Sequence, residues 1–212
     1  MARPDETFRL KPATGRLRRW LRGEGGRLLV VVALLLVART SFANHYAVPS
    51  GSMEYTLMPG DHVAVDMSAY GLRLPFTDIV LLARDQPRRG DVAVFDSPRD
   101  GTRLVKRVAA VGGDLVELRN GRLSINGRPL AGDASAARER FGARTVALNL
   151  DAGGGPDIGR FVVPRGQVLM LGDHRGDSLD GRYFGLVPAS SLYARAVGVF
   201  WRRGEGPVWK SL

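Results

Sequence analysis

The sequence predicts a mainly β protein, in which an antiparallel β-sheet domain with a small inserted subdomain follows one N-terminal transmembrane helix. Two observations predict this fold. An uninterrupted apolar run of eleven residues, Leu28 to Ala38, stands near the N-terminus. After residue 46 no long helical period occurs, and short alternating runs are separated by Gly, Pro, Asn and Asp. We therefore expect a basic segment at 1–27, a membrane anchor at 28–48 and a β domain at 49–212, with the insertion at about 120–160.

The anchor is predicted from the apolar run and its basic flank. Eleven helical residues span only about 16 Å, short of the ~30 Å hydrocarbon core, so we extend the span to Val48 and let Arg39 snorkel to the headgroups. Five preceding arginines place the N-terminus in the cytoplasm and the β domain outside it: Arg16, Arg18, Arg19, Arg22 and Arg27. A cleaved secretory signal ending at Ser41-Phe42-Ala43 fits the same pattern. Either interpretation exports the bulk of the chain.

Composition excludes several classes of site. The chain has no cysteine, which rules out disulfides, thiolate zinc sites and a cysteine nucleophile. His45, His62 and His174 are too scattered to predict a metal site, and no cofactor motif occurs. Of the net charge of +10, residues 1–45 carry +6, so nucleic-acid binding is poorly supported and contact with anionic phospholipid is favoured. Trp201 and Trp209, amid basic residues, suit either a membrane interface or ordinary packing.

The β domain is read from short runs between turn residues. Asn120-Gly121 predicts a type I′ hairpin, and Asn126-Gly127 marks a second turn. The stretch from Asp133 to Arg144 and the loose Asp151 to Pro156 predict an excursion at about 133–157. The expected strands are His62–Val65, Ile79–Leu82, Asp91–Phe95, Arg103–Val111, Leu115–Arg119, Leu123–Ile125, Thr145–Leu150, Arg160–Val163 and Gln167–Leu171.

Pro49-Ser50-Gly51-Ser52-Met53 is the first segment that can carry chemistry. Its glycine and proline permit a tight turn that exposes a hydroxyl and aligns backbone N–H groups, as a nucleophile beside an oxyanion hole requires. Taken alone, Ser-Gly-Ser is far more often a turn or a linker than a catalytic segment.

Lys106 is the second candidate, because 28 of the 31 cationic residues are Arg. Strand alternation places Leu104, Lys106 and Val108 on one face and Arg107 on the other. A lysine among aliphatic neighbours loses hydration, which lowers its pKa and makes it a general base near neutral pH. Arginine stays protonated and cannot do this. A strand lysine facing solvent is the structural alternative.

The third segment is the polar loop Gly172 to Gly185, which follows a predicted strand. It is dense in carboxylates and arginines, and a solvated turn would explain it equally well. A neutral buried lysine, however, needs a hydrogen-bond partner that brings no negative charge, and Ser178 is of that type.

In this order the three segments resemble the bacterial signal peptidase I family. Its members are membrane-anchored Ser/Lys endopeptidases that remove signal peptides from exported preproteins after small-x-small motifs. PSGSMEYTLMPGD is similar to the nucleophile motif, RGDVAVF with LVKRVAAVGGD to the base-bearing strands, and GDHRGDSLDGRYFG to the final loop. With RTSF of the anchor, the resemblance covers much of residues 39–118 and 167–188. It implies antiparallel sheets, the bacterial inner membrane as location, a retained single-pass anchor, and signal peptides and membrane phospholipid as partners.

The resemblance also implies residue roles. Ser52 is the expected nucleophile, Lys106 the general base and Ser178 the hydroxyl that orients it, while Ser50 and the Ser52 N–H form the oxyanion hole. Substrate is expected along Leu104 and Val105, with small pockets lined by Met53 and Leu57. Asp173, Arg175, Asp180 and Arg182 are expected to form ion pairs that shape the loop. Neither a metal nor a cofactor is implied.

The sequence departs from the family pattern at three positions. Tyr55 stands where proline is usual, His174 where asparagine is usual and Gly181 where serine is usual. These departures affect the rigidity of the turn and substrate preference rather than the reaction type.

Three alternatives stay open. A Ser-His-Asp hydrolase would use His174 and Asp173, although adjacent residues rarely adopt triad geometry. A dedicated peptidase for a pilin or conjugation substrate shares every motif. A membrane-anchored β scaffold would have no activity.

Overall fold

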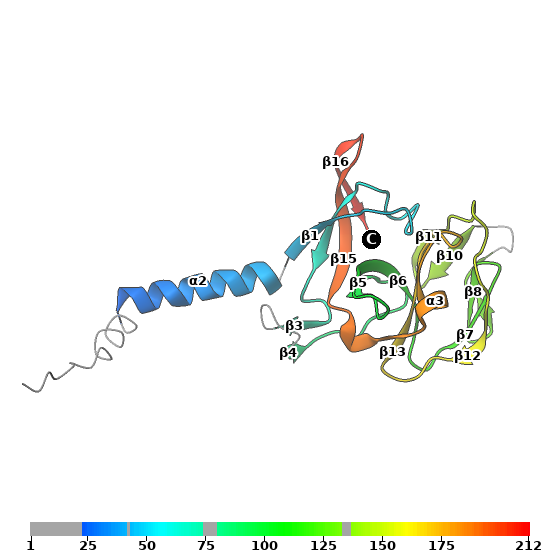
Figure 1. Cartoon of the computed structure of the whole chain (residues 1–212), viewed down its shortest axis with the longest axis horizontal. Helices are drawn as coiled ribbons and strands as arrows, with labels where there is room; N and C mark the ends of the chain where they lie inside the picture. Colours follow the sequence, from blue (N-terminus) through cyan, green and yellow to red (C-terminus); the bar gives the residue numbers. More distant parts are fainter. Residues whose placement is uncertain (1–22, 42, 74–79, 133–136) are drawn as a thin grey trace, which may run out of the picture. The chain divides into compact units, whose positions relative to one another are not determined.

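The structure of the chain is a computed structural model that describes residues 23–41, 43–73, 80–132 and 137–212. The chain divides into two units, Met1–Arg39 and Thr40–Leu212. The described part of the first unit is helical, and the second unit is built of β-strands (Figure 1).

Helix α2 spans Glu24–Ser41, and its end corrects the predicted anchor at 28–48. The chain turns into strand β1, Ala43–Ala47, which pairs in antiparallel register with β2, His62–Asp66. Backbone groups of residues 43–47 are thus bonded across a sheet and are not available to a helix. The apolar side chains Leu28 to Val32 are exposed along α2. In the described part of the chain, no helix is both long and apolar enough to cross a membrane.

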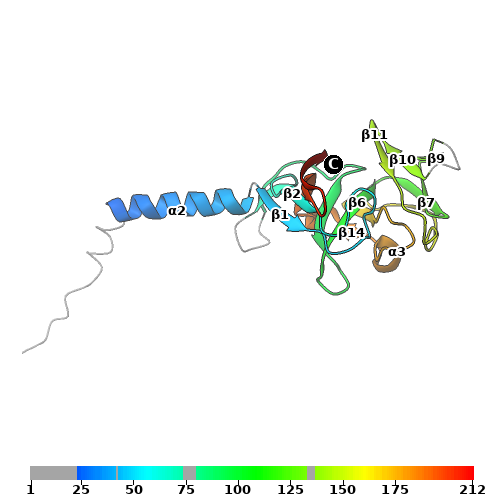
Figure 2. The ribbon, with the colours of Figure 1, turned by 90° about the horizontal axis from the view of Figure 1, so that it is seen from above.

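The second unit is dominated by an eight-stranded sheet in the order β1-β2-β15-β5-β6-β13-β14, with β16 beside β15 (Figures 1 and 2). Every pairing between these strands is antiparallel. The remaining members are β5 (Val92–Asp96), β6 (Arg103–Val111), β13 (Gln167–Leu171), β14 (Val187–Pro188), β15 (Ala194–Arg202) and β16 (Gly206–Ser211). A small hairpin of β3 (Gly71–Arg73) and β4 (Val80–Ala83) stands apart, and the first residue of the predicted strand 79–82 lies outside the described residues.

The insertion lies between β6 and β13, which are neighbours in the main sheet. It begins at Leu115 and ends at Val162, slightly outside the predicted limits, and contains β7 (Leu115–Arg119), β8 (Arg122–Ile125), β9 (Arg128–Pro129), β10 (Arg138–Phe141), β11 (Arg144–Ala147) and β12 (Ile158–Val162). Asn120 and Gly121 both have positive φ between β7 and β8, which confirms the type I′ turn. Part of the predicted excursion, residues 133–136, lies outside the described residues.

Three buried apolar clusters occur in the described part of the chain, and one of them joins the insertion to the main sheet. Val116, Leu118 and Leu123 of the insertion share this cluster with Ala109 and Leu169 of the main sheet. The insertion is therefore packed on the main sheet. Two short helical segments follow β13: α3 (Gly181–Phe184) and the 3₁₀ turn Ala189–Ser191.

Candidate active site

Ser52 lies in the turn that joins β1 to β2. The base of this turn is closed by two backbone hydrogen bonds, from the Val48 N–H to Asp61 and from the Gly60 N–H to Val48. Met53 and Leu57 are fully buried beneath it and hold it against the sheet. Among the described residues, nothing accepts a hydrogen bond from the Ser52 N–H. The turn thus presents both a hydroxyl and a free backbone donor.

Lys106 projects from β6 toward this turn, and its Nζ is hydrogen-bonded to the Ser52 Oγ. The residue is only 2% exposed. Burial lowers the pKa of the Lys106 ammonium to about 8, because the charged form loses hydration. Attraction by Asp180 opposes this shift, but Asp180 is already neutralised by Arg182. The geometry therefore places a partly neutral amine on a hydroxyl.

Arg107, the next residue on β6, is as deeply buried as Lys106. Strand alternation predicts that Lys106 and Arg107 lie on opposite faces of the strand. The structure buries both side chains. Arg107 is neutralised: its Nε donates to Asp173 Oδ1 at 2.8 Å, and it also donates to the Gly90 carbonyl at 2.7 Å. Among the described residues, no carboxylate lies within ion-pair distance of Lys106. Arg107 is therefore a structural cation held in an ion pair, whereas Lys106 has no carboxylate that would hold its proton.

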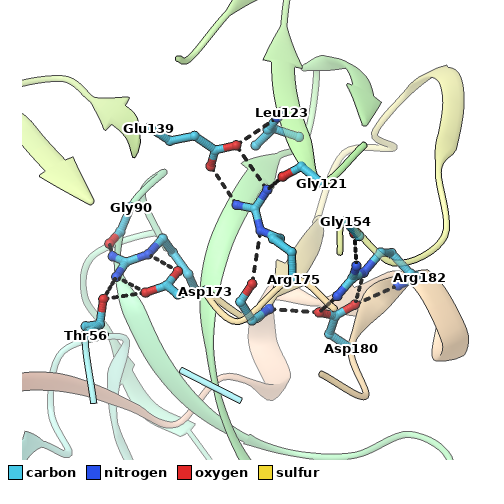
Figure 3. A network of polar contacts seen from close by, with 12 residues as sticks. Thr56, Gly90, Gly121, Leu123, Glu139, Gly154, Asp173, Arg175, Asp180 and Arg182 are labelled. Carbon is cyan, nitrogen blue, oxygen red and sulfur yellow. Dashed lines mark hydrogen bonds and ion pairs between the residues drawn. The ribbon is translucent and has the colours of Figure 1, made fainter. Parts of the chain in front are cut away.

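The loop after β13 is held by buried ion pairs, but only one lies within the loop (Figure 3). Arg182 and Asp180 form the predicted internal pair at 2.8 Å, and Asp180 also accepts from the Gly172 N–H. Arg175 binds Glu139 on β10 at 2.6 Å. Asp173 likewise pairs outside the loop, with Arg107. No sequence pattern predicts Glu139 and Arg107 as partners of this loop, since they lie far from it along the chain.

The role predicted for Ser178, orienting Lys106, stays a prediction. Its hydroxyl is buried without a hydrogen-bond partner in the described structure, and it makes no bond to Lys106. It does approach the nucleophile turn: a Cβ on Gly172 would lie 2.2 Å from the Ser178 Oγ and 2.5 Å from the Ser52 carbonyl oxygen. Only glycine at 172 leaves room for this approach.

A pocket of about 500 Å³ opens beside Ser52 and Lys106. All four predicted substrate residues line it: Met53, Leu57, Leu104 and Val105. Ser50 is also in the lining, with its Oγ 3.4 Å from the Ser52 Oγ. Residues 103–106 of β6 pair with β5, whereas pairing with β13 begins only at Arg107. One edge of β6 is therefore unpaired along this pocket within the described strands.

The His174 side chain argues against a Ser-His-Asp triad. Its Nε2 lies 2.7 Å from Asp151 Oδ1, and its ring makes no hydrogen bond to a serine in the described structure. Asp173, the acid of the alternative triad, is occupied by Arg107. The hydroxyl of Ser52 is bonded to a lysine and not to an imidazole.

The other two departures also have structural counterparts. Tyr55 is half exposed and follows a cis peptide bond. Gly181 begins α3, where a Cβ would lie 2.8 Å from both Leu169 Cδ1 and the Met170 carbonyl oxygen. The usual serine therefore does not fit at 181 without displacing β13.

Comparison with known proteins gives consistent matches. The sequence profile of the family described as "Signal peptidase, peptidase S26" matches residues 17–201. Signal peptidase I of Pseudomonas fluorescens is 33% identical over 202 residues, covering 83% of this chain and 71% of that protein. A probable signal peptidase I-2 of Synechocystis is 30% identical, covering 86% and 73%. A crystal structure of a signal peptidase I from Enterococcus faecalis aligns at 30% identity with a TM-score of 0.36, covering 59% of this chain and 99% of that one.

Proposed function

Because the chain belongs to the signal peptidase family, peptidase S26, and is a serine hydrolase of the signal peptidase I type, we propose that Ser52 and Lys106 are its catalytic dyad. The observation that carries this proposal is the contact between the Lys106 Nζ and the Ser52 Oγ, made by an amine that is buried and unpaired with any carboxylate in the described structure. Such an amine is a base, because its neutral form is accessible near neutral pH.

In the proposed reaction, neutral Lys106 takes the proton of the Ser52 hydroxyl as the oxygen attacks the scissile carbonyl. The C–N bond then breaks, and the ammonium of Lys106 returns its proton to the leaving amine. A water molecule next attacks the ester carbonyl while Lys106 accepts its proton; the bond to the Ser52 oxygen breaks, and Lys106 returns the proton to that oxygen. Arg107 takes no part, since its charge is fixed by Asp173.

Three further groups assist this step. The free Ser52 N–H and the Ser50 hydroxyl, whose Oγ lies 3.4 Å from the Ser52 Oγ, would bind the developing oxyanion. The buried, unpartnered hydroxyl of Ser178 would orient the Lys106 amine once substrate is bound. A buried hydroxyl with unused hydrogen-bonding capacity supports this role, because leaving it unsatisfied is costly.

The substrate is proposed to lie as an extended strand along the unpaired edge of β6, in the pocket beside Ser52. Leu104 and Val105 would contact its backbone, and the apolar surface from Met53 and Leu57 would accept small side chains before the cleavage site. Signal peptides of exported preproteins are therefore the proposed substrates.

We test the dyad with Ser52→Ala, Lys106→Ala and Lys106→Arg in the full chain in detergent. Each variant should lose cleavage of a preprotein while remaining folded, and the arginine variant should fail as completely as alanine because arginine keeps its proton. Ser124→Ala, on β8 of the insertion, is the matched control. Full activity in any dyad variant would overturn the assignment.

The same preparation distinguishes the alternatives. Cleavage of many exported precursors, followed by sequencing of the new N-termini, indicates a general signal peptidase, whereas cleavage of one pilin or conjugation precursor indicates a dedicated one. A serine-directed acylating probe that modifies Ser52 only when Lys106 is present excludes an inactive scaffold.

Attachment to the bacterial inner membrane is also proposed, with a cytoplasmic N-terminus and the β unit on the outer side. The exposed apolar side chains Leu28 to Val32 of α2 and the basic residues before them support it. Trp201 and Trp209 are exposed on the β15–β16 hairpin and would rest on phospholipid headgroups. In the full chain reconstituted into anionic vesicles, brominated lipids should quench the tryptophan fluorescence less in the double Trp→Ser variant, and unchanged quenching would exclude this contact.

A further inference from the structure

His174 lies behind the nucleophile turn, in a cluster that the proposed chemistry does not use. Its side chain is 9% exposed. The Nε2 atom is 2.7 Å from Asp151 Oδ1, and the Nδ1 atom is 3.6 Å from Glu54 Oε2. The Nδ1 atom is buried and has no hydrogen-bond partner. An unsatisfied ring nitrogen that faces a carboxylate requires an explanation.

The pairing with Asp151 decides which nitrogen carries the proton. Desolvation raises the pKa of the Asp151 carboxyl, but hydrogen bonds from His174 and Asn149 outweigh it and lower the pKa below its usual value. An ionised carboxylate only accepts hydrogen bonds, so Nε2 is the protonated nitrogen. The Nδ1 atom then has an N–H for Glu54 only when the ring carries its second proton. A ring that carries both protons can therefore bridge Asp151 and Glu54.

Glu54 connects this bridge to the nucleophile. A Cβ on Gly51 would lie 2.6 Å from Glu54 Oε1, so the carboxylate is folded over the residue that precedes Ser52. The Glu54 N–H also donates to the Gly51 carbonyl at 2.9 Å. From the other side, the His174 backbone N–H donates to the Ser52 carbonyl at 3.2 Å. Backbone bonds of residues 54 and 174 thus hold the carbonyls of Gly51 and Ser52, and the Glu54 carboxylate covers Gly51.

The charges around the ring favour this bridge. Glu54 from the turn and Asp151 from the segment after Asn149 are the carboxylates that face it. Its neighbours in the loop are neutralised elsewhere, Asp173 by Arg107 and Arg175 by Glu139. Asn149 donates to both facing carboxylates, at 3.2 and 3.4 Å, and adds no charge.

We propose that His174 is a positioning residue for the nucleophile: its ring bridges Asp151 and Glu54, and through Glu54 it fixes the turn that aims Ser52 at Lys106. This inference rests on the proposed dyad but assigns a further residue to the site. Because the ring does not line the substrate pocket, its loss should reduce kcat and leave KM nearly unchanged.

Two conservative variants test the contact of the ring with Glu54 and its contact with Asp151 separately. In His174→Asn the amide nitrogen takes the place of Nδ1 and can donate to Glu54, whereas in His174→Gln it takes the place of Nε2 and can donate only to Asp151. We expect His174→Ala and His174→Gln to lower kcat about ten- to a hundred-fold, as a small misplacement of a reacting group does. We expect His174→Asn to restore most of kcat. His45→Asn, an exposed histidine on β1, is the control.

Equal losses in the Asn and Gln variants, or an effect on KM alone, would each overturn the proposal.

The rate at which a serine-directed acylating probe modifies Ser52 is measured in parallel, because it needs no signal peptide. If the unmodified chain is acylated but cleaves no preprotein, the substrate assignment fails while the ranking of the His174 variants still tests the positioning role. If preproteins are cleaved and the ranking differs from that expected, only the positioning role fails.

Discussion

The pH dependence of cleavage follows directly from the burial of Lys106. Its pKa is lowered from 10.5 to about 8 by loss of hydration. That difference corresponds to about 3 kcal/mol, and it raises the neutral fraction of the amine at pH 7 from about 0.03% to about 9%. Since only the neutral amine accepts the Ser52 proton, kcat/KM should increase about ten-fold per pH unit below about pH 8 and level off above it.

The assay is cleavage of a signal-peptide substrate without ionisable groups near the cleavage site, at constant ionic strength. Circular dichroism at each pH confirms that the chain stays folded. Lys106→Arg, inactive at every pH, shows that the profile belongs to this amine. A midpoint near 10, the ordinary value for lysine, would refute the argument from desolvation. So would activity that does not change between about pH 6 and pH 9.

Three further predictions concern stability and packing. At pH 7, Lys106→Met should raise the free energy of unfolding by up to about 3 kcal/mol and shift the urea midpoint upward. The reason is that lysine binds its proton more tightly in the unfolded chain than in the folded one. For the same reason the unmodified chain should gain stability as the pH rises from about 8 to about 10.5, a gain absent in the Met variant; equal urea curves at pH 7 would contradict this. Asp173→Asn should cost about 3–5 kcal/mol, since it leaves the buried Arg107 charge unpaired, whereas Glu117→Gln, at a solvent-screened pair with Arg160, should cost much less. Similar denaturant midpoints for these two variants would count against a structural Arg107. Gly172→Ala should reduce both cleavage and stability, the latter by about 1–3 kcal/mol, because its Cβ would meet the Ser178 Oγ and the Ser52 carbonyl. Gly159→Ala, whose Cβ would meet nothing within 4 Å, is the control, and equal thermal midpoints would show that the close approach at Gly172 is not required.

Local patterns predicted much of the β unit. The Asn120-Gly121 turn was read correctly because type I′ hairpins demand positive φ at both positions, which Asn and Gly tolerate. The strand carrying Lys106 was likewise predicted with its observed limits, Arg103–Val111. The extension of the anchor to Val48 was wrong, because hydropathy and length cannot reveal that residues 43–47 pair with β2. Pairing between strands is a property of the folded chain.

The sequence predicts which residue types form the site, but it does not predict which of their charges are neutralised. The scarcity of lysine among 31 cationic residues drew attention to Lys106 before any coordinates were known. Sequence patterns could not decide whether Lys106 or its neighbour Arg107 would be the neutralised cation, since strand alternation treats them alike. Asp173, 66 residues further along the chain, decides it by pairing with Arg107.

The sequence alone determined which groups this protein has for catalysis: a hydroxyl in a tight turn, one amine in an apolar strand and no thiol. Only the tertiary structure decided their state. Packing of β6 against the turn and the final loop removes water from Lys106, and pairing elsewhere removes the carboxylates that would otherwise hold its proton. A pKa depends on every group that surrounds an atom in space, and these groups come from segments that are distant along the chain.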